Sequence, residues 1–360
     1  YLAMADAGFL TTETIPSTVE VTSIVSAADE AKVMVTGNVQ LGENEDKVTV
    51  VISVGTTEAA NERTYEIADC VTGAFSKEIT DLAAGRYYFS VSLKGIAGSA
   101  SVPLLLRVGV LPAVEWTGAG NGTSWTDPKN WSSGAVPLAD DGVLCGARVS
   151  APLTVVPGDG EAKAKKITIT TPHALRLENV AALDVEIAES AAEENVISPM
   201  DFNLMDGSDV GTWSVSEGKT LKIGNLIGRA SLVKTGAGRV WLAGSNSDRA
   251  IGTTEVREGT LLFCYNRQLG AGLTVGGSDI PAVAKAESAA SNFNPFDTNK
   301  RPVHVLRNGL LDLSSDGSAG QHWIAQSQVG QFTVDAGGTL DLGQRRYAYA
   351  GMDQVLVING

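Results

Sequence analysis

The side chains that could carry out chemistry are few in this sequence and widely spaced. Ser231 and Lys234 fit the Ser-x-x-Lys spacing of a serine nucleophile with a lysine base, but the motifs that accompany that pair in hydrolases are missing. The three histidines, His173, His304 and His322, show no metal-ligand spacing. The sequence also lacks a Gly-x-Ser-x-Gly elbow and a phosphate-binding loop. We therefore expect no catalytic serine, no metal site and no cofactor.

A recurring four-residue pattern predicts the strands on which functional side chains would have to lie. It consists of a small residue, Leu or Val, a variable residue, and Leu, Ile or Phe, and it occurs at 174–177, 220–223, 239–242, 260–263, 310–313 and 339–342. Side chains alternate along a strand, so the two apolar residues share one face and the variable residue lies on the other. Such short strands bury their apolar face only by stacking on similar strands, which predicts a β-solenoid.

The variable position of each unit is predicted to be exposed to solvent. These positions are Arg176, Lys222, Trp241, Leu262, Asp312 and Asp341. Asp312 and Asp341 could form the carboxylate pair of a glycosidase, one or two coils apart, because parallel β-helices also carry polysaccharide lyases and glycosidases. Solvated side chains explain both positions equally well, and Leu262 interrupts any polar row. The predicted core residues of these units are Leu221, Leu261, Leu311 and Leu340.

The spacing of the units is irregular. Gaps of 46 residues between Leu175 and Leu221 and of 50 residues between Leu261 and Leu311 are the largest, and each is expected to hold an extra coil or an insertion. Within the second gap, residues 277–302 form the only insertion long enough to line the sides of a catalytic cleft. Their Ala, Ser and Asn content is more typical of a mobile loop.

One stretch of the repeat is specific enough to indicate a family. Residues 232–246 followed by 252–261 resemble the autotransporter-associated β-strand repeat, in which "K-x-G-x-G-x-L-x-L-x-G-x-N" precedes "G-x-T-x-V-x-x-G-T-L". The matching residues are Lys234, Gly236, Gly238, Leu242, Gly244, Asn246, Gly252, Thr254, Val256, Gly259, Thr260 and Leu261. Val240 replaces the usual Leu, and Asp248-Arg249 replaces a common Tyr-Thr pair. The resemblance covers about a tenth of the chain, and implies a right-handed parallel β-helix in an exported bacterial surface protein, without catalysis.

Half of the six tryptophans lie close together upstream of the repeats. Trp116, Trp125 and Trp131 fall within sixteen residues of a Gly- and Thr-rich segment that resembles the opening of solenoids in large bacterial surface proteins. Exposed indole rings can stack on sugars, whereas buried rings would cover the apolar side chains and unpaired strand edges at the end of a solenoid. We favour the cap, and keep these three residues, together with Trp241, as candidate ligand contacts.

Length and composition agree with export. The chain has 360 residues, of which 43% are hydrophobic, and a net charge of −14 from 41 acidic and 27 basic residues, which argues against nucleic acid or an anionic membrane surface as a partner. No run approaches the roughly 18 apolar residues of a membrane span. The first ten residues lack the features of a signal peptide, so we expect a mature chain or a fragment. Because the sequence ends just after the apolar run 355–358, we expect the parent protein to continue into further coils.

The three cysteines, Cys70, Cys145 and Cys264, lie in different segments and indicate neither a disulfide framework nor a metal site. Cys145 and Cys264 each follow a large apolar residue, Leu144 and Phe263, in a strand-like run. Both are therefore predicted to be small core residues.

The N-terminal part of the chain has a different pattern. Its valine-rich alternating runs lie at 19–25, 32–39, 47–54, 75–79, 87–93 and 102–108, and predict six or seven antiparallel strands, hence a β-sandwich. Residues 73–89 resemble the fibronectin type III signature, with Tyr87 as the best match for the tyrosine that packs across the E–F corner, although the usual B-strand Trp is absent. Such modules commonly act as spacers or protein-binding units.

These patterns together predict an all-β chain. We expect a leader or linker at 1–15, an antiparallel β-sandwich at 16–110, a Trp-rich cap at 111–145 and a parallel β-helix at 146–360. The predicted function is that of a non-enzymatic stalk or adhesin in a secreted or cell-surface bacterial protein, with a host or cell-surface glycan or protein as partner. The alternative is a polysaccharide-binding or polysaccharide-cleaving β-helix, in which Asp312 and Asp341 would be the catalytic residues.

Overall fold

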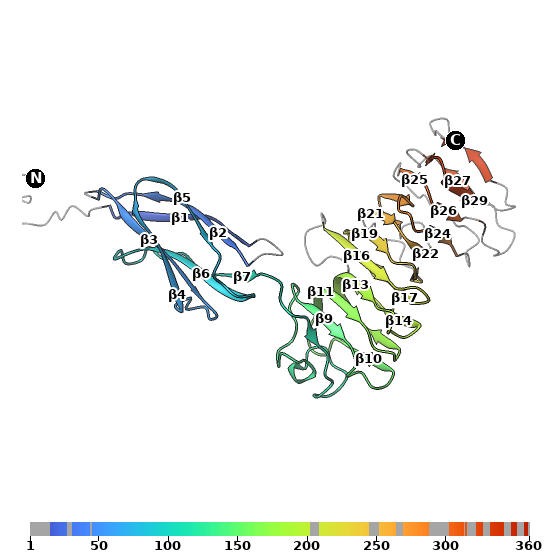
Figure 1. Ribbon diagram of the computed structural model, residues 1–360, viewed down its shortest axis with the longest axis horizontal. Helices are drawn as coiled ribbons and strands as arrows, with labels where there is room; N and C mark the ends of the chain where they lie inside the picture. Colours follow the sequence, from blue (N-terminus) through green and yellow to red (C-terminus); the bar gives the residue numbers. More distant parts are fainter. Residues whose placement is uncertain are drawn as a thin grey trace, which may run out of the picture. The chain divides into compact units, whose positions relative to one another are not determined.

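The computed structural model describes most of the chain as strands and turns. The described residues are 15–26, 31–43, 45–201, 209–244, 252–263, 269–287, 302–312, 314, 322–326, 332–341, 347–350 and 356–358. The chain divides into two compact units, Tyr1–Pro112 and Ala113–Gly360 (Figure 1). These described residues contain no α-helix, so the predicted all-β fold is confirmed. None of them forms a helix long and apolar enough to cross a membrane.

The N-terminal unit consists of two antiparallel sheets. Its strands are β1 (Thr18–Ser26), β2 (Val33–Gln40), β3 (Val48–Gly55), β4 (Arg63–Cys70), β5 (Gly73–Ile79), β6 (Gly85–Leu93) and β7 (Leu104–Val108). One sheet has the order β1-β2-β5 and the other β4-β3-β6-β7 (Figure 1). A single apolar core, formed by residues such as Val35 of β2 and Val50, Ile52 and Phe89 of the second sheet, joins the two sheets face to face.

Six of these seven strands coincide with the predicted valine-rich runs, and β4 does not. Strand β4 lies at the edge of its sheet, and most of its residues are exposed, so it carries only a weak apolar alternation. Tyr65, Ile67 and Cys70 are its residues that pack against the core. Tyr87 lies on the inward face of β6 with Phe89 and is partly buried against the same core.

The C-terminal unit is a stack of parallel strands. Its first part holds β8 (Val114–Glu115), η1 (Pro128–Asn130), β9 (Gly142–Cys145), β10 (Leu153–Val155), β11 (Ala162–Ile169), β12 (Leu175–Leu177), β13 (Val180–Ile187), β14 (Glu194–Ile197), β15 (Met200–Asp201), β16 (Val210–Val215), β17 (Thr220–Ile223) and β18 (Leu226–Ile227). It continues with β19 (Ser231–Thr235), β20 (Arg239–Leu242), β21 (Thr253–Val256), β22 (Gly259–Phe263), β23 (Gly272–Val275), β24 (Ala282–Ala286), β25 (Val303–Val305), β26 (Gly309–Asp312), β27 (His322–Gln326), β28 (Phe332–Val334), β29 (Thr339–Asp341), β30 (Tyr347–Ala350) and β31 (Leu356–Ile358).

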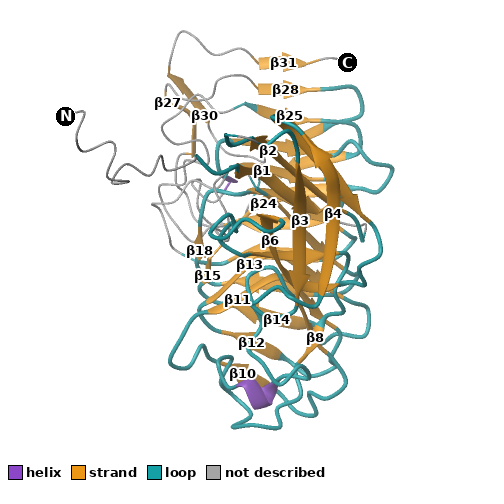
Figure 2. Ribbon diagram, turned by 90° about the vertical axis from the view of Figure 1, so that its left-hand side faces the viewer, coloured by secondary structure: helices purple, strands orange, loops and turns teal. Residues whose placement is uncertain are grey.

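Two long parallel sheets form the walls of this stack. The nine-stranded sheet has the order β10-β12-β14-β17-β20-β22-β24-β26-β29. The thirteen-stranded sheet runs from β8 and β9 through β11, β13, β16, β19, β21, β23, β25 and β28 to β31, with β15 and β18 paired beside it. From β10 to β14 and from β19 to β26, successive strands of the chain alternate between the two sheets, so each of these coils adds one strand to each wall. Strands β27 and β30 form a separate two-stranded parallel sheet, and Figure 2 shows the strands stacked along the unit. The unit is a parallel β-solenoid, as predicted.

The register of the nine-stranded sheet confirms the predicted inward positions. Leu221, Val240, Leu261, Ala284, Leu311 and Leu340 are successive register partners. Leu221, Leu261 and Leu311 are fully buried, as predicted. Leu340 is only partly buried, because β29 is the last strand of this sheet among the described residues and no further strand covers its outer side.

The two largest gaps between repeat units each hold an extra coil. Strand β14 fills the gap after Leu175, and β24 fills the gap after Leu261. Residues 277–302 are therefore not a single insertion, because Ala282, Ala284 and Ala286 of β24 are buried in the core of the stack. The inward positions of β24 hold alanines instead of the larger Leu-type residues of the other coils. The repeat pattern, which requires such residues, therefore does not identify this coil. Residues 288–301 lie outside the described part.

Candidate functional site

The outward face of the nine-stranded sheet carries a continuous column of side chains. In register order it runs Thr154, Arg176, Val196, Lys222, Trp241, Leu262, Lys285, Asp312 and Asp341. All six residues predicted to point outward belong to this column, which confirms the predicted strand alternation. Leu262 is nevertheless buried, although it is not part of the core cluster, so its expected exposure was wrong.

Asp312 and Asp341 are direct register partners on the neighbouring strands β26 and β29. Parallel neighbours lie about 4.8 Å apart, so the sheet brings the two residues together as predicted. Asp341 is exposed, but Asp312 is buried with 9% of its surface accessible, contrary to the prediction. The cause is a set of partners: Lys285 Nζ lies 3.0 Å from Oδ2, and Ser314 donates to Oδ1 from its backbone nitrogen (2.9 Å) and its hydroxyl (2.6 Å).

The electrostatics of Asp312 do not suit a catalytic acid. Burial by itself raises the pKa of this carboxyl, but the hydrogen bonds from Ser314 and the positive charge of Lys285 outweigh burial and leave the pKa below its ordinary value. A glycosidase needs one carboxyl that stays protonated near neutral pH. Asp312 is instead a stable carboxylate that neutralises Lys285.

Ser231 and Lys234 lie on opposite faces of the same strand. In β19 the inward residues are Leu232 and Lys234, whose register partners include Trp213 and Val256 of the core. Ser231 Oγ points away from the core and accepts a hydrogen bond from the Thr253 backbone nitrogen at 3.1 Å. The lysine cannot activate this hydroxyl, so the geometry gives the Ser-x-x-Lys spacing no catalytic role.

Lys234 is the most unusual ionisable residue of the solenoid. It is fully buried, and its Nζ donates to the carbonyl oxygens of Thr235 (2.8 Å), Gly236 (2.6 Å) and Glu258 (3.0 Å). Burial lowers the pKa of this ammonium to about 7, and the charge of Glu258 opposes the shift. Glu258 Oε2 in turn accepts from the Gly236 backbone nitrogen at 2.8 Å. Through these hydrogen bonds Lys234 and Glu258 join the corners of two successive coils.

The three clustered tryptophans are buried at the N-terminal end of the stack. Trp131 contacts both others edge to face, with ring centroids 4.9 Å from Trp116 and 4.8 Å from Trp125. The segment also bonds to the ends of the first strands, from the Trp116 nitrogen to Leu144 O (2.9 Å) and from the Trp125 nitrogen to Val156 O (2.7 Å). This geometry favours the cap interpretation, because buried rings offer no platform for a sugar.

Three polar residues hold the loop between these tryptophans, and the sequence reasoning missed them. Asn130 is fully buried, and its Oδ1 accepts from the backbone nitrogens of Gly120 (2.9 Å) and Gly122 (3.1 Å). Asn121 Oδ1 accepts from Asn130 Nδ2 at 2.9 Å, and Asp127 Oδ2 accepts from the Asn121 nitrogen at 2.8 Å. Asn and Asp between glycines are typical of such backbone-bonding loops, which was the signal available in the sequence.

Trp241 is the candidate ligand contact that remains at the surface. It is partly exposed on β20, and Lys222 Nζ of the neighbouring strand lies 4.1 Å from the centroid of its ring. Arg239, two residues earlier on β20, is exposed and is the register partner of Thr220. Two cations and an aromatic ring therefore share one part of the sheet surface.

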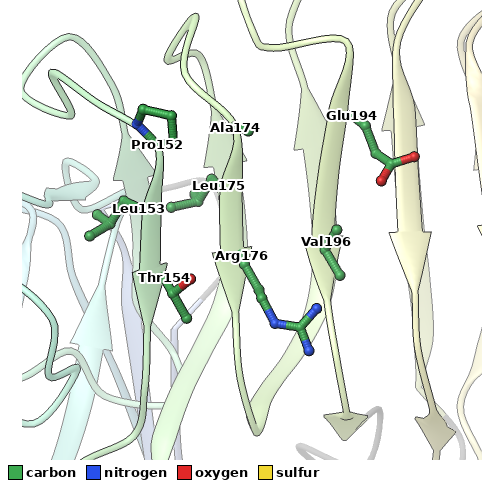
Figure 3. Close-up of a pocket in the computed structure, with 8 residues that line it drawn as sticks. All are labelled: Pro152, Leu153, Thr154, Ala174, Leu175, Arg176, Glu194 and Val196. Carbon is green, nitrogen blue, oxygen red and sulfur yellow. The ribbon is translucent and has the colours of Figure 1, made fainter.

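A shallow cavity of about 310 Å³ adjoins this part of the sheet. It lies over β10, β12 and β14, and its lining residues are Pro152, Leu153, Thr154, Ala174, Leu175, Arg176, Glu194 and Val196. Figure 3 shows the Arg176 side chain reaching from β12 towards the strand that carries Val196. Arg176 Nε also lies 2.8 Å from Glu178 Oε1. The lining offers a hydroxyl, a guanidinium and a carboxylate, which can bind polar groups of a ligand.

The remaining sequence candidates offer no reactive group. Cys145 is buried in the core as predicted, and burial raises the pKa of its thiol to about 12. His304 is exposed on the outward face of β25, whereas Cys264 and the side chain of His322 lie outside the described residues. Within the described ranges, no group of three or more His, Cys, Asp or Glu residues could hold a metal ion.

Comparison with known proteins gives no further identification. No protein-family model, no curated protein and no solved structure matches the chain.

Proposed function

We propose that this chain is a non-enzymatic stalk or adhesin segment of a secreted bacterial surface protein. The observation that carries the proposal is the continuous parallel pairing of the solenoid, in which a single apolar core extends from Trp116 to Val334. Nine strands of one sheet, stacked at about 4.8 Å, give a rod about 40 Å long. Such a rod suits a protein that holds a binding region away from a surface.

The resemblance to autotransporter-associated repeats supports the same proposal. Lys234, Gly236 and Gly259, which match the family motif, occur at the corners where successive coils meet. Gly259 has a φ of +67°, a conformation that favours glycine, and a β-carbon there would collide with the carbonyl oxygen of Gly236. The motif residues therefore serve the stacking of coils. Seven antiparallel strands in sheets of three and four are likewise compatible with a fibronectin type III-like spacer.

A display experiment tests the stalk role. The whole chain is placed between a membrane anchor and a reporter binding domain on bacterial cells, and capture of a target on an opposing surface is measured. We expect capture to exceed that of a short flexible linker, and to tolerate Lys165→Gln, a change at an exposed residue of β11. Capture no better than that of the short linker would contradict the stalk role.

A second measurement addresses the enzymatic alternative. The purified chain is incubated with a panel of neutral and acidic polysaccharides, and new reducing ends and unsaturated uronates are quantified. The proposal predicts no turnover. Cleavage that disappears in Asp312→Asn or Asp341→Asn would overturn it in favour of a polysaccharide-cleaving solenoid.

A further inference from the structure

We propose that the outward face of β17 and β20 binds an acidic, linear glycan through Lys222, Arg239 and Trp241, with the polymer continuing into the cavity over β10, β12 and β14. The inference deepens the proposed surface function, on which it rests for its biological setting. Binding itself is a property of the purified chain.

The cations of this patch differ from most others on the solenoid. On the strands of the solenoid and the turns next to them, several basic side chains pair with carboxylates, as in Lys166–Glu186 (2.6 Å), Arg257–Glu255 (2.8 Å), Arg307–Asp279 (2.7 Å) and Lys285–Asp312 (3.0 Å). Neither Lys222 nor Arg239 has a carboxylate within ion-pair distance among the described residues. Glu194 of β14 is also a diagonal neighbour of Lys222, so two outward cations and one carboxylate leave a net positive charge on this part of a chain whose overall net charge is −14.

The register places the three side chains within reach of one ligand group. Lys222 is the direct partner of Trp241, and Arg239 is the partner of Thr220, so Lys222 and Arg239 are diagonal neighbours on adjacent strands. Diagonal positions lie about 7–8 Å apart at the backbone, a distance that two long side chains bridge easily. A sulfate or carboxylate can therefore contact both cations beside the indole, whose ring lies 4.1 Å from Lys222 Nζ.

The cavity over the first strands extends this patch in one direction. Glu194 and Val196, at its edge, are register partners of Thr220 and Lys222. The five strands β10, β12, β14, β17 and β20 are consecutive in the sheet, so patch and cavity together span about 20 Å at the ordinary strand spacing. That length accommodates several sugar units of a linear chain and exceeds a monosaccharide.

Charge distinguishes this ligand from a nucleic acid. The carboxylate of Glu194 borders the cavity, so a charged group is favoured at Lys222 and Arg239 and disfavoured in the cavity. Duplex DNA carries one charge for about every 1.7 Å and would meet both Glu194 and the overall negative charge. A glycan whose charges are widely spaced avoids this repulsion.

Binding of defined polymers to the intact chain tests the inference. Keratan sulfate supplies sulfate groups, hyaluronan supplies carboxylates, and dextran is the neutral control, with poly-glutamate as an acidic polymer without sugars. Affinity is measured by titration at physiological ionic strength. Quenching of tryptophan fluorescence by iodide is measured in parallel, because Trp241 should be protected by the ligand. We expect binding of keratan sulfate, hyaluronan or both, and none of dextran or poly-glutamate.

Matched variants connect binding to the patch. Lys222→Gln and Arg239→Gln should each weaken binding about tenfold, since each removes one charge-assisted contact. Trp241→Leu should abolish the protection from iodide, and Lys165→Gln, an exposed lysine on the other sheet, should change nothing. Thermal unfolding of every variant confirms that the fold is retained.

Each outcome separates the inference from the proposed function. No binding of either acidic glycan, or binding unchanged in the Lys222→Gln/Arg239→Gln double variant, overturns the glycan site while the stalk role stands. Equal binding of poly-glutamate shows a general anion surface and also overturns it. Cleavage of a bound glycan would contradict the non-enzymatic function and leave the binding site in place.

Discussion

Replacing Lys234 by Met tests whether the buried ammonium holds two coils together. Met keeps most of the aliphatic volume but removes the three donors that bind the carbonyl oxygens of Thr235, Gly236 and Glu258. Hydrogen bonds to a charged group contribute about 1.5–3 kcal/mol each. The substitution also removes the cost of burying the charge. The lowering of the pKa from 10.5 to about 7 corresponds to a cost of about 5 kcal/mol. The balance is a net loss of about 0–4 kcal/mol near pH 6.

The pH dependence of this loss is the sharper test. Because the folded state lowers the pKa of Lys234, the unfolded chain binds one more proton than the folded chain between pH 7 and about 10. Stability of the wild type should therefore rise with pH across this window, by up to about 1.4 kcal/mol per pH unit, and Lys234→Met should lack the rise. The deficit of the variant should thus grow from pH 7 to pH 10.

Urea denaturation followed by tryptophan fluorescence measures this unit selectively, because all six tryptophans lie after Pro112. Lys165→Met is the matched control, since Lys165 is exposed, and it should not alter the slope. Glu258→Gln should move the start of the window to lower pH, because the charge of Glu258 raises the pKa of Lys234. A deficit for Lys234→Met that stays constant from pH 7 to pH 10 would refute the reasoning.

Three further substitutions address the core, the cap and the charged column. Leu261→Ala should lower the free energy of unfolding by about 2–5 kcal/mol, since the side chain is fully buried, and a loss below 1 kcal/mol in urea would show that the inward register is wrong. Trp125→Ala should cost about 3–5 kcal/mol without changing glycan affinity, and a selective loss of affinity would contradict its role in the cap. Asp312→Asn should lower the free energy of unfolding by about 1–3 kcal/mol at pH 7. Because the folded state lowers the pKa of Asp312, this difference between wild type and variant should vanish as the pH falls through about 4 and below. A difference that persists at pH 2 would argue against the ion pair with Lys285.

The period-two alternation was sufficient to predict the solenoid and its two faces. Each variable residue of the repeat fell in one outward column because register in a parallel sheet follows from stacking equivalent positions. Two coils escaped recognition for a physical reason. Strand β14 has Asn195 at an inward position, where its side chain bonds to the Leu175 backbone nitrogen at 3.2 Å, and β24 uses alanines. Neither resembles the Leu-type anchors of the other coils.

The error at Asp312 follows from one of these missed coils. An acidic residue at an outward position is expected to be solvated, unless a neighbouring strand supplies a partner. Lys285 lies on β24, a strand that the repeat pattern does not indicate, so the sequence does not predict the ion pair that buries the Asp312 carboxylate. Lys234 escaped prediction differently. Lys234 lies two residues after Leu232, so strand alternation indicates an inward position. The carbonyl oxygens that accept from its Nζ, however, belong to turns between strands, and the sequence does not reveal the geometry of these turns.

Different positions of the solenoid thus meet different physical demands. Inward columns and corners, where Leu261 and Lys234 lie, are constrained by packing and by backbone carbonyls that need donors, so changes there act on stability. The outward column lies outside the core, although Leu262 and Asp312 are buried within it, and in its last part Lys285 pairs with Asp312. Around Lys222 and Arg239 this neutralisation is missing while an indole is present. Positive charge without an ion-pair partner adds nothing to the stacking of coils, and so we attribute it to the recognition of a ligand.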